Sequence, residues 1–378
     1  MSVYLDHNAT AKVRPEAIAA MARTMENVGN PSSVHAAGRA ARAAMEQARE
    51  HVARLIAAPA STVVFLSGGT EANALALESA VAAGARRLIV SAVEHDSVRE
   101  GAAASGVAVE VLPVTRDGTA DLDWLHERLA RWDAADGKPF VALMLANNET
   151  GVIQPVKEAS EIVRAADGWL HVDAIQAAGK IPVDSRGLGA DTLAISAHKI
   201  GGPQGVGALT FGPRATLSRR QHGGGQERGR RGGTENLPGI SGFGAAAEIA
   251  VEGLAAQAPL RDAAAERLKA AGAVVIGEAA PRLPNTLCVA APGWTSDLQV
   301  MALDLAGVMV SAGSACSSGK VKASPVLAAM GLAELAPCAI RVSGGWCSTP
   351  EDWNRFADVW LEAHARHEAR RPARKEVA

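Results

Sequence analysis

The sequence lacks the features that define several broad classes of protein. No apolar run reaches the roughly 18 residues that a membrane-spanning helix requires. Residues 1–6 (MSVYLD) lack the basic start and apolar core of a signal peptide. The net charge of −2 gives no bulk attraction to nucleic acid or to an anionic membrane. We therefore expect a cytoplasmic protein that binds neither membranes nor nucleic acid directly.

Cysteines and aromatic residues are also scarce. The four cysteines form no Cys-x-x-Cys pair, and the ten histidines form no His-x-x-x-His pair, so we expect no metal site. A disulfide framework is not expected in a reducing compartment. With only one Tyr, five Phe and seven Trp, aliphatic side chains must build the core. The cysteines are Cys288, Cys316, Cys338 and Cys347.

What the chain does have is a regular alternation of apolar runs and alanine-rich helical stretches. This alternation is typical of βαβ units, so the fold class is predicted to be α/β with a mostly parallel sheet. The predicted strands are 63–66, 87–92, 107–112, 140–145, 169–172, 192–195 and 209–211, and the predicted helices are 72–83, 122–132 and 157–166.

The composition changes near Pro259, and the 378 residues suffice for two domains. Beyond this point we predict a smaller α+β domain with helices at 260–271 and 298–305 and strands at 274–276 and 286–290. The charged residues 366–378 are expected to form a solvated tail. We assign residues 14–257 to a large domain, and residues 1–13 and 258–378 to the small one.

Lys199 ends a stretch that begins apolar and turns polar, and Gly201 and Gly202 follow it closely. A lysine at the junction of a buried strand and a glycine-rich turn can lose its hydration, which makes the amine a usable nucleophile. Other polar groups also follow predicted strands, and in an open α/β sheet ligands bind beyond these strand ends.

Each of these other groups has two interpretations. The segment 67–71 (SGGTE) is either an anion site at a helix N-terminus or a simple N-cap. Asp173 either pairs with a protonated pyridine nitrogen or caps a helix. Residues 147–149 (NNE) orient a substrate or form a turn. His95 stacks on a flat ring, shuttles protons, or does neither.

The order of these groups resembles that of the fold-type I enzymes that use pyridoxal 5′-phosphate (PLP), and specifically the class V aminotransferase branch. Residues 196–199 (SAHK) match the Schiff-base lysine motif of this branch. The similarity extends over nearly the whole chain. It includes three further segments, 4–10 (YLDHNAT), 29–35 (GNPSSVH) and 223–236 (GGGQERGRRGGTEN). With these segments the chain resembles cysteine desulfurases that feed iron–sulfur cluster assembly. This resemblance implies a large PLP-binding domain, with helices flanking the sheet, and a smaller α+β domain.

The resemblance also implies a role for individual residues. Lys199 would form the Schiff base with PLP and act as acid and base, with His95 stacked on the ring as a helper. Arg341 would bind the substrate carboxylate, which suits the two-pronged geometry of a guanidinium. The other implied contacts are Asp173 with the pyridine nitrogen, Gln176 with the phenolic oxygen, Gly69, Thr70, Ser196 and His198 with the phosphate, Asn148 with cofactor and substrate, and Thr234 with the phosphate in the neighbouring subunit of a homodimer.

Cys316 determines the expected reaction. It lies in a run of small residues, 311–320, that is predicted to be a mobile loop, where a purely structural cysteine is rare. The resemblance implies that its thiolate takes the sulfur of L-cysteine, leaving a persulfide on Cys316 and releasing L-alanine. An iron–sulfur scaffold or a thio-modifying protein would accept the sulfur, and Cys316 would meet a cluster only transiently.

Other functions remain as alternatives. Selenocysteine lyases and other class V PLP transaminases or lyases share the motifs, and a sulfur carrier without turnover is a further possibility. A P-loop at 313–320 is rejected because the spacing of its glycines is wrong and Val321 replaces the required Ser or Thr. The segment 228–233 is too short and isolated for an RNA-binding RGG region. Trp346 stands where the family usually has an arginine, so the resemblance does not predict the packing or charge around this position.

Overall fold

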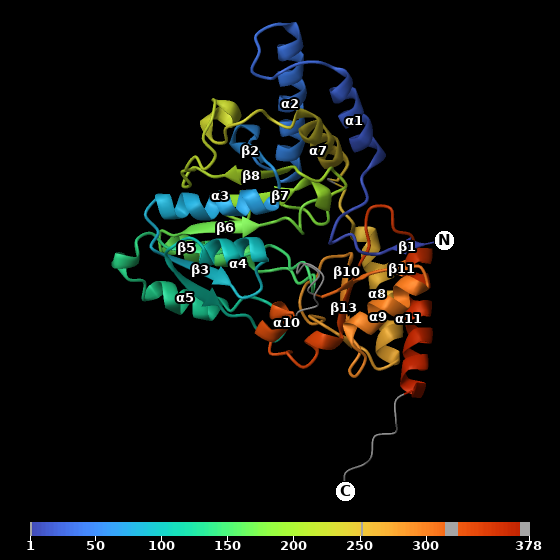
Figure 1. Ribbon diagram of the computed structural model, residues 1–378. Coiled ribbons are helices and arrows are strands. Elements are labelled where there is room, and N and C mark those ends of the chain that lie inside the picture. Colours follow the sequence, from blue (N-terminus) through green and yellow to red (C-terminus); the bar gives the residue numbers. More distant parts are fainter. Residues whose placement is uncertain (1, 251, 314–323, 371–378) are drawn as a thin grey trace.

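The computed structural model describes residues 2–250, 252–313 and 324–370. Its largest sheet has seven strands in the order β2-β8-β7-β6-β5-β3-β4 (Figure 1). β8 is antiparallel to both of its neighbours and the other pairs are parallel, which confirms the predicted α/β class. The strands are β2 (Val63–Leu66), β3 (Arg87–Ser91), β4 (Ala108–Leu112), β5 (Phe140–Ala142), β6 (Trp169–Asp173), β7 (Thr192–Ser196) and β8 (Gly207–Phe211).

β5 is shorter than the predicted strand 140–145. The backbone N–H of Met144 donates to the buried carboxyl of Glu94 instead of to a neighbouring strand. The flanking N–H groups of Leu143 and Leu145 still donate to carbonyl groups of β6. The chain therefore continues along β6 to residues 147–149, although the regular ladder has ended.

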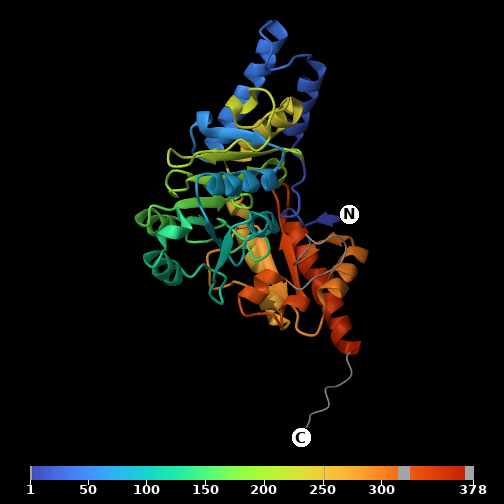
Figure 2. The same cartoon turned by 60° about the vertical axis from the view of Figure 1, so that its left-hand side comes forward.

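Four helices connect the strands of this sheet, and three more form a separate layer beside it. α1, α2, α4 and α7 were not predicted, and α7 packs against both α1 and α2 above the sheet in Figures 1 and 2. α7 contains three glycines, which lower its helix propensity. Tertiary packing compensates, because a Cβ on Gly244 would lie 2.5 Å from the Cα of Ala48. The helices are α1 (Pro15–Glu26), α2 (Ala36–Leu55), α3 (Gly69–Ala82), α4 (Asp96–Ala103), α5 (Leu122–Ala130), α6 (Val156–Ala165) and α7 (Leu237–Ala250).

The remaining strands form two small sheets. The antiparallel sheet has the order β12-β13-β10-β9, and β1 pairs in parallel with β11. Helices α8, α9 and α11 lie together on the other side of the molecule from α1 and α2 (Figure 1). The elements are β1 (Val3–Tyr4), α8 (Ala258–Ala270), β9 (Val274–Val275), β10 (Thr286–Ala290), α9 (Ser296–Leu305), β11 (Val308–Met309), β12 (Ser311–Ala312), α10 (Pro325–Ala329), β13 (Ala339–Ser343) and α11 (Pro350–Arg370).

The apolar cores follow this arrangement. Val3 and Leu5 share a buried cluster with Leu268, Ile340 and Trp360, whereas the cluster around the seven-stranded sheet contains side chains from positions 17 to 283. Leu283, which lies beyond residue 258, belongs to the larger cluster, so the two clusters do not separate strictly at the predicted boundary. The division of the chain at residues 14 and 258 stays a prediction.

The C-terminal region differs from the expected tail. Residues 366–370 are the last turns of α11, whose Trp353, Phe356 and Trp360 are buried in the smaller core. His364 and His367 pack against the ring of Trp294, and the chain stays helical to Arg370, so the predicted tail is wrong for residues 366–370. Residues 371–378 lie outside the described residues.

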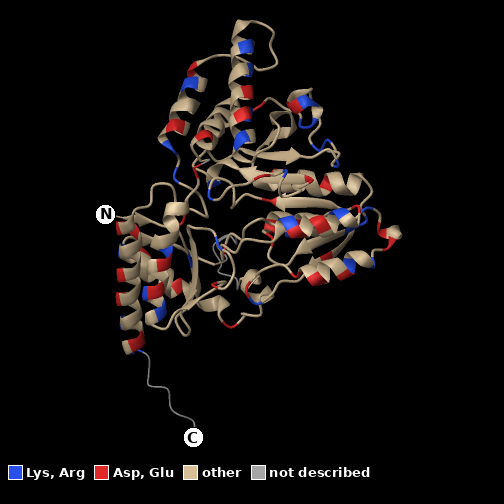
Figure 3. Ribbon diagram, turned by 180° about the vertical axis from the view of Figure 1, so that it is seen from behind, with Lys and Arg blue, Asp and Glu red and all other residues tan. Residues whose placement is uncertain are grey.

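Charge is distributed without a dominant sign. Acidic and basic residues are interspersed along the outer helices, including α11 (Figure 3). Within residues 2–250, 252–313 and 324–370, no helix is both long and apolar enough to cross a membrane. The same residues contain no group of three or more His, Cys, Asp or Glu side chains arranged to hold a metal ion.

Candidate functional site

A cavity of about 340 Å³ lies beyond the carboxyl ends of the parallel strands. It brings together all of the predicted site residues except Thr234 and Cys316. Thr234 lines a separate depression beside Arg231 and Asn236, and Cys316 lies outside the described residues. The predicted residues around the cavity are Gly69, Thr70, His95, Asn148, Asp173, Gln176, Ser196, His198, Lys199 and Arg341.

Lys199 lies in the short turn that follows β7, where the apolar strand gives way to polar residues. Its Nζ donates to the backbone carbonyl groups of Asn8, at 2.7 Å, and Ala9, at 2.8 Å. Gly201 follows with a φ of +89°, a left-handed conformation that favours glycine. The turn therefore places a primary amine at the cavity wall, next to the N-terminal segment.

Asp173 is the last residue of β6 and is almost fully buried. Its Oδ1 accepts from the N–H of Ile175 at 2.9 Å, and its Oδ2 accepts from Nδ2 of Asn73 at 2.8 Å. Burial raises the pKa of Asp173, and these hydrogen bonds and the positive charge of Lys199 oppose that shift. The carboxylate thus stabilises a turn and also lines the cavity, so it does not serve only as a helix cap.

His95 is the N-cap of α4. Its Nδ1 accepts from the backbone N–H of Ser97 at 3.0 Å, which leaves the proton of a neutral ring on Nε2. The Oγ of Ser97 lies 2.8 Å from the same nitrogen and also accepts from Asn73. These contacts fix both the position and the tautomer of the imidazole at the cavity.

The first turn of α3 faces the cavity at Gly69 and Thr70. Gly68 occupies the N-cap position and provides no side-chain cap, so the simple N-cap interpretation of this segment is wrong. Free N–H groups in a first helical turn favour an anion. A Cβ on Gly69 would lie 2.2 Å from Cδ1 of Ile175, so a larger residue here would displace the side chain of Ile175 at the cavity.

Arg341 comes from β13 and is almost fully buried. Its Nη2 donates to Oδ1 of Asp6 at 2.9 Å, and its Nη1 donates to the carbonyl oxygen of Asn148 at 3.1 Å. Its Nε is buried and has no hydrogen-bond partner among the described residues. An unsatisfied buried donor is costly, and a ligand carboxylate would satisfy it.

Residues 147–149 include both a turn-forming residue and a residue that lines the cavity, so each of the two predicted roles applies to part of this segment. The side chain of Asn147 accepts from the N–H groups of Glu149 and Thr150, so it stabilises a turn. Asn148 lines the cavity, as predicted, while its carbonyl group receives the contact from Arg341.

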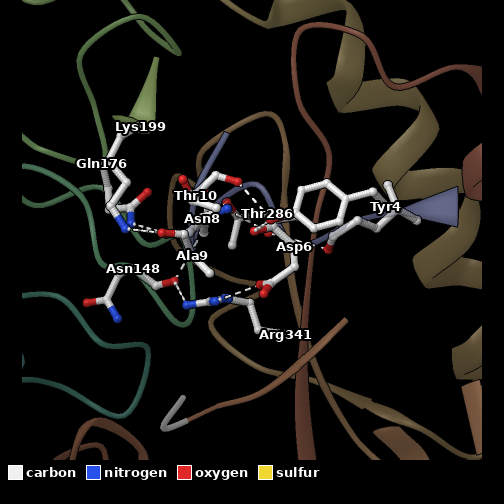
Figure 4. Close-up of polar contacts among 12 residues, drawn as sticks. Tyr4, Asp6, Asn8, Ala9, Thr10, Asn148, Gln176, Lys199, Thr286 and Arg341 are labelled. Carbon is white, nitrogen blue, oxygen red and sulfur yellow. Dashed lines mark hydrogen bonds and ion pairs between the residues drawn. The ribbon is translucent and has the colours of Figure 1, made fainter. Parts of the chain in front are cut away.

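Asn8 is a functional candidate that the sequence analysis did not identify. It is almost fully buried, and its carbonyl oxygen accepts from both Lys199 and Gln176 (Figure 4). Its Oδ1 accepts from Lys180 at 2.6 Å, and its Nδ2 donates to Oγ1 of Thr286 at 2.9 Å. The motif 4–10 contained this residue, but the pattern alone gave no reason to separate it from its neighbours.

Trp346 contacts two residues near the N-terminus. Its Nε1 donates to the carbonyl of Lys12 at 2.7 Å, and the guanidinium of Arg14 lies 5.0 Å from its ring centroid. Nε of Arg14 donates to the carbonyl of Ile200, the residue after Lys199. A cation–π contact therefore connects this substitution to the turn that carries Lys199.

The groups around the cavity fit the PLP molecule that the motifs imply. The amine, the buried carboxylate and the uncapped helix N-terminus offer partners for an aldehyde, a pyridine nitrogen and a phosphate. Burial and the nearby Lys199 and Lys180 lower the pKa of His198 to about 4, so its ring is neutral and can act as a hydrogen-bond donor.

Comparison with known proteins agrees with this geometry. The model of the family "Aminotransferase class-V" matches residues 3–356. A cysteine desulfurase of Cereibacter sphaeroides is 42% identical over 373 residues, covering 94% of each chain. The structure of a NifS-like protein from Rickettsia africae has a TM-score of 0.88 and 31% identity, and covers 97% of this chain and 100% of that one. The structure titled "SspA in complex with cysteine" has a TM-score of 0.77 and 27% identity, with coverage of 90% and 98%.

These matches extend over nearly the whole described chain, and they include the segments that build the cavity. The chain belongs to the class-V aminotransferase family, whose members use pyridoxal 5′-phosphate.

Proposed function

We propose that this chain is a PLP-dependent cysteine desulfurase, which converts L-cysteine to L-alanine and leaves the sulfur as a persulfide on Cys316. The observation that carries the proposal is the single cavity in which Lys199, Asp173, His95 and Arg341 meet. The curated relative from C. sphaeroides bears the same function in its name, and the SspA structure contains cysteine.

Arg341 binds the substrate carboxylate in this mechanism. Asp6 and the carbonyl of Asn148 hold two of its nitrogens, and the unpartnered Nε is available for the ligand. Because the guanidinium is already oriented, little further side-chain entropy is lost when the substrate binds.

Lys199 and His95 handle protons. PLP, when bound, withdraws electrons from the substrate Cα and makes its hydrogen acidic. Nζ of Lys199 takes that proton once the amine is released, and returns a proton to the product carbon. His95, whose Nδ1 is engaged by Ser97, presents Nε2 as the second group able to hold a proton.

Cys316 supplies the nucleophile. Its thiolate attacks the sulfur of the bound cysteine, so a new S–S bond forms while the Cβ–S bond of the substrate breaks. The electron pair of the broken bond remains with the substrate carbon, which takes up a proton to become the methyl group of alanine. The terminal sulfur leaves with an acceptor, which we propose to be an iron–sulfur scaffold or a thio-modifying protein.

Incubation of the PLP-loaded protein with L-cysteine tests the proposal. We expect alanine in solution and one added sulfur on Cys316 by mass spectrometry. Cys316→Ala should retain the visible absorbance of the bound cofactor and lose the persulfide. Release of alanine and sulfide at the wild-type rate by this variant would exclude the sulfur-transfer role of Cys316.

The incubation with L-cysteine separates two of the alternatives, and kinetics with L-selenocysteine tests the third. A transaminase would form a keto acid from an amino donor without modifying Cys316, and a carrier without turnover would release no alanine. A selenocysteine lyase would show a kcat/KM for L-selenocysteine far above that for L-cysteine.

We also propose that the protein is a homodimer with composite sites. Thr234 is exposed and lies outside the cavity of its own chain, and Met25, Val28 and Val34 are exposed apolar side chains on the layer of α1 and α2. A second copy would cover such apolar surface. The partner's Thr234 would then reach the phosphate.

Hybrid dimers test the composite site. Lys199→Ala and Thr234→Ala homodimers should each have impaired sites, whereas a hybrid of the two retains one site with both native residues. We expect mixing under exchange conditions to restore activity. No recovery despite demonstrated hybrid formation would contradict the contribution of Thr234 across the interface.

A further inference from the structure

Lys180 is a buried amine close to the cavity that the proposed mechanism does not use. It lies at the end of the turn after β6, is 3% exposed, and donates from Nζ to Oδ1 of Asn8 at 2.6 Å. A second short hydrogen bond reaches Oε1 of Gln176. In the described part of the chain both contacts are to amide oxygens, so Lys180 is not simply one half of a buried ion pair.

The burial of this amine has an electrostatic cost. Desolvation, and after it the positive charges of Lys199 and Arg341, lower the pKa of Lys180 well below its usual value. A buried polar group of this kind is retained only if its hydrogen bonds are satisfied, and it is expensive if they are not. The cost indicates that the hydrogen bonds of Lys180 to Asn8 and Gln176 have a role that an apolar side chain of the same length could not fill.

The contribution is visible at the side-chain amide of Gln176. Nε2 of Gln176 donates to the carbonyl oxygen of Asn8 at 2.9 Å, and a backbone carbonyl can only accept. Oε1 of the same amide accepts from Lys180. A rotation that exchanged the oxygen and nitrogen would break both contacts, so Asn8 and Lys180 together fix the orientation of the amide.

This orientation matters because Gln176 lines the cavity. One of its two N–H bonds is directed to Asn8, and the other is left for a ligand acceptor. If the amide were reversed, an oxygen would face the ligand oxygen and repel it. Lys180 itself does not line the cavity, so any effect it has on the ligand passes through Gln176 and Asn8.

We propose that Lys180 is a positioning residue, which locks the Gln176 amide so that an N–H group is directed to the phenolic oxygen of the cofactor. The proposal rests on the proposed function only in that it takes PLP as the ligand. Lys180, four residues after Gln176, would thereby determine that the Gln176 amide presents a donor and not an acceptor to the cofactor.

A double-mutant cycle tests the proposal. Lys180→Met and Gln176→Ala are prepared singly and together in the full chain, and their melting temperatures are compared. PLP affinity is measured by titration, and the visible absorbance maximum of the bound cofactor is recorded. We expect Lys180→Met to weaken PLP binding about tenfold and to shift the maximum in the same direction as Gln176→Ala.

The decisive comparison is in the Gln176→Ala background, where Lys180→Met should change neither the affinity nor the maximum further. An equal effect of Lys180→Met in both backgrounds would show that Lys180 acts independently of Gln176 and would overturn the proposal.

Lys180→Gln provides a second variant if Lys180→Met does not fold. It keeps an N–H donor without an ammonium group, so we expect the wild-type absorbance maximum to be retained. A shifted maximum in a Lys180→Gln protein with the wild-type melting temperature would contradict the positioning role. Failure of the proposed function appears differently, as the absence of any visible band when the wild-type chain is mixed with PLP.

Discussion

Oδ1 of Asp6 lies 2.9 Å from Nη2 of Arg341, an ion pair that joins the N-terminal segment to β13 across 335 positions of sequence (Figure 4). Asp6 is largely buried and Arg341 almost completely so. Breaking a pair this enclosed is costlier than breaking a surface pair. The N-terminal segment thus helps to build the proposed substrate site.

Substitution of Asp6 should affect substrate binding more than turnover. In Asp6→Ala the guanidinium of Arg341 loses its charged partner and its fixed orientation, so we expect the KM for L-cysteine to rise about tenfold with a smaller change in kcat. Asp6→Asn, which retains the acceptor oxygen, is the matched control, and its KM should lie between those of the wild type and Asp6→Ala. A lower KM in Asp6→Ala would mean instead that Asp6 competes with the substrate carboxylate.

Replacement of Arg341 should give a larger effect. Arg341→Lys keeps a positive charge but cannot bind a carboxylate through two parallel hydrogen bonds. Steady-state kinetics with L-cysteine should show kcat/KM reduced about 100-fold. Unchanged kcat/KM would exclude Arg341 as the residue that binds the carboxylate.

Lys199→Ala should abolish the visible absorbance that PLP acquires when it is linked to the protein. The amine at this position is the proposed covalent attachment point, and alanine offers no nitrogen. Absorbance spectra after removal of free PLP provide the measurement. Lys157→Ala, an exposed position on α6, is the control and should retain the band. A Lys199→Ala protein that kept both the band and turnover would refute the assignment.

Asp173→Asn should bind PLP but lose activity. A neutral amide cannot stabilise a protonated ring nitrogen as a carboxylate does, so we expect kcat to fall by about 100-fold or more. The amide oxygen can replace only one of the two carboxylate oxygens that accept from Asn73 and from the N–H of Ile175, so the melting temperature is measured alongside PLP binding. Wild-type kcat in this variant, with PLP bound, would remove Asp173 from the mechanism.

Glu149 should make stability depend on pH. Burial raises its pKa from 4.5 to about 7; Asp96 acts in the same direction, against the hydrogen bond from Ser324 and the charges of Arg341 and Arg99. Between these two pKa values the folded state holds a proton that the unfolded state has lost. The contribution of Glu149 to the free energy of unfolding is therefore fully present below about pH 4.5. It declines as the pH rises through 7, by roughly 3 kcal/mol in total.

Denaturant unfolding at about pH 5 and about pH 8.5 measures this contribution. Glu149→Gln keeps an acceptor for Ser324 and cannot ionise, so we expect it to lose less stability over this interval than the wild-type chain. Glu161→Gln, on the exposed face of α6, is the control and should follow the wild type. A parallel decline in Glu149→Gln would assign the pH dependence to other groups.

Much of the sheet was predictable because its strands are short apolar runs between polar turns. Val63–Leu66 and Thr286–Ala290 have the predicted bounds, and the other predicted strands differ by a few residues at their ends. Helix α7 was missed because its glycines lower its helix propensity, and its stability comes from packing against α1 and α2, as at Gly244 and Ala48. Helices α1, α2 and α4 were also missed, although the buried residues of α2, such as Ala41, Met45, Ala48 and Val52, recur with helical spacing.

The candidate site was predictable to the extent that strand order places polar residues at one edge of a sheet. Lys199, Asp173 and His95 each follow a strand, so the α/β rule alone indicated that they would be close. Their roles came from resemblance to a family. Asn8 and Lys180 were not identified, because the strand pattern does not include the segment of Asn8, and the turn of Lys180 is not distinctive.

The sequence by itself determined the α/β class, the lysine at the end of a buried strand and the motifs that indicate the family, because these depend on local periodicity and on neighbouring residues. Only the tertiary structure decided three contacts of the site. Asp6 pairs with Arg341, the carbonyl oxygen of Asn8 accepts hydrogen bonds from Lys199 and Gln176, and Lys180 is buried beside Asn8 and Gln176. These contacts join positions up to hundreds of residues apart, and their strength comes from the exclusion of water, which is established only when the two sets of elements pack together.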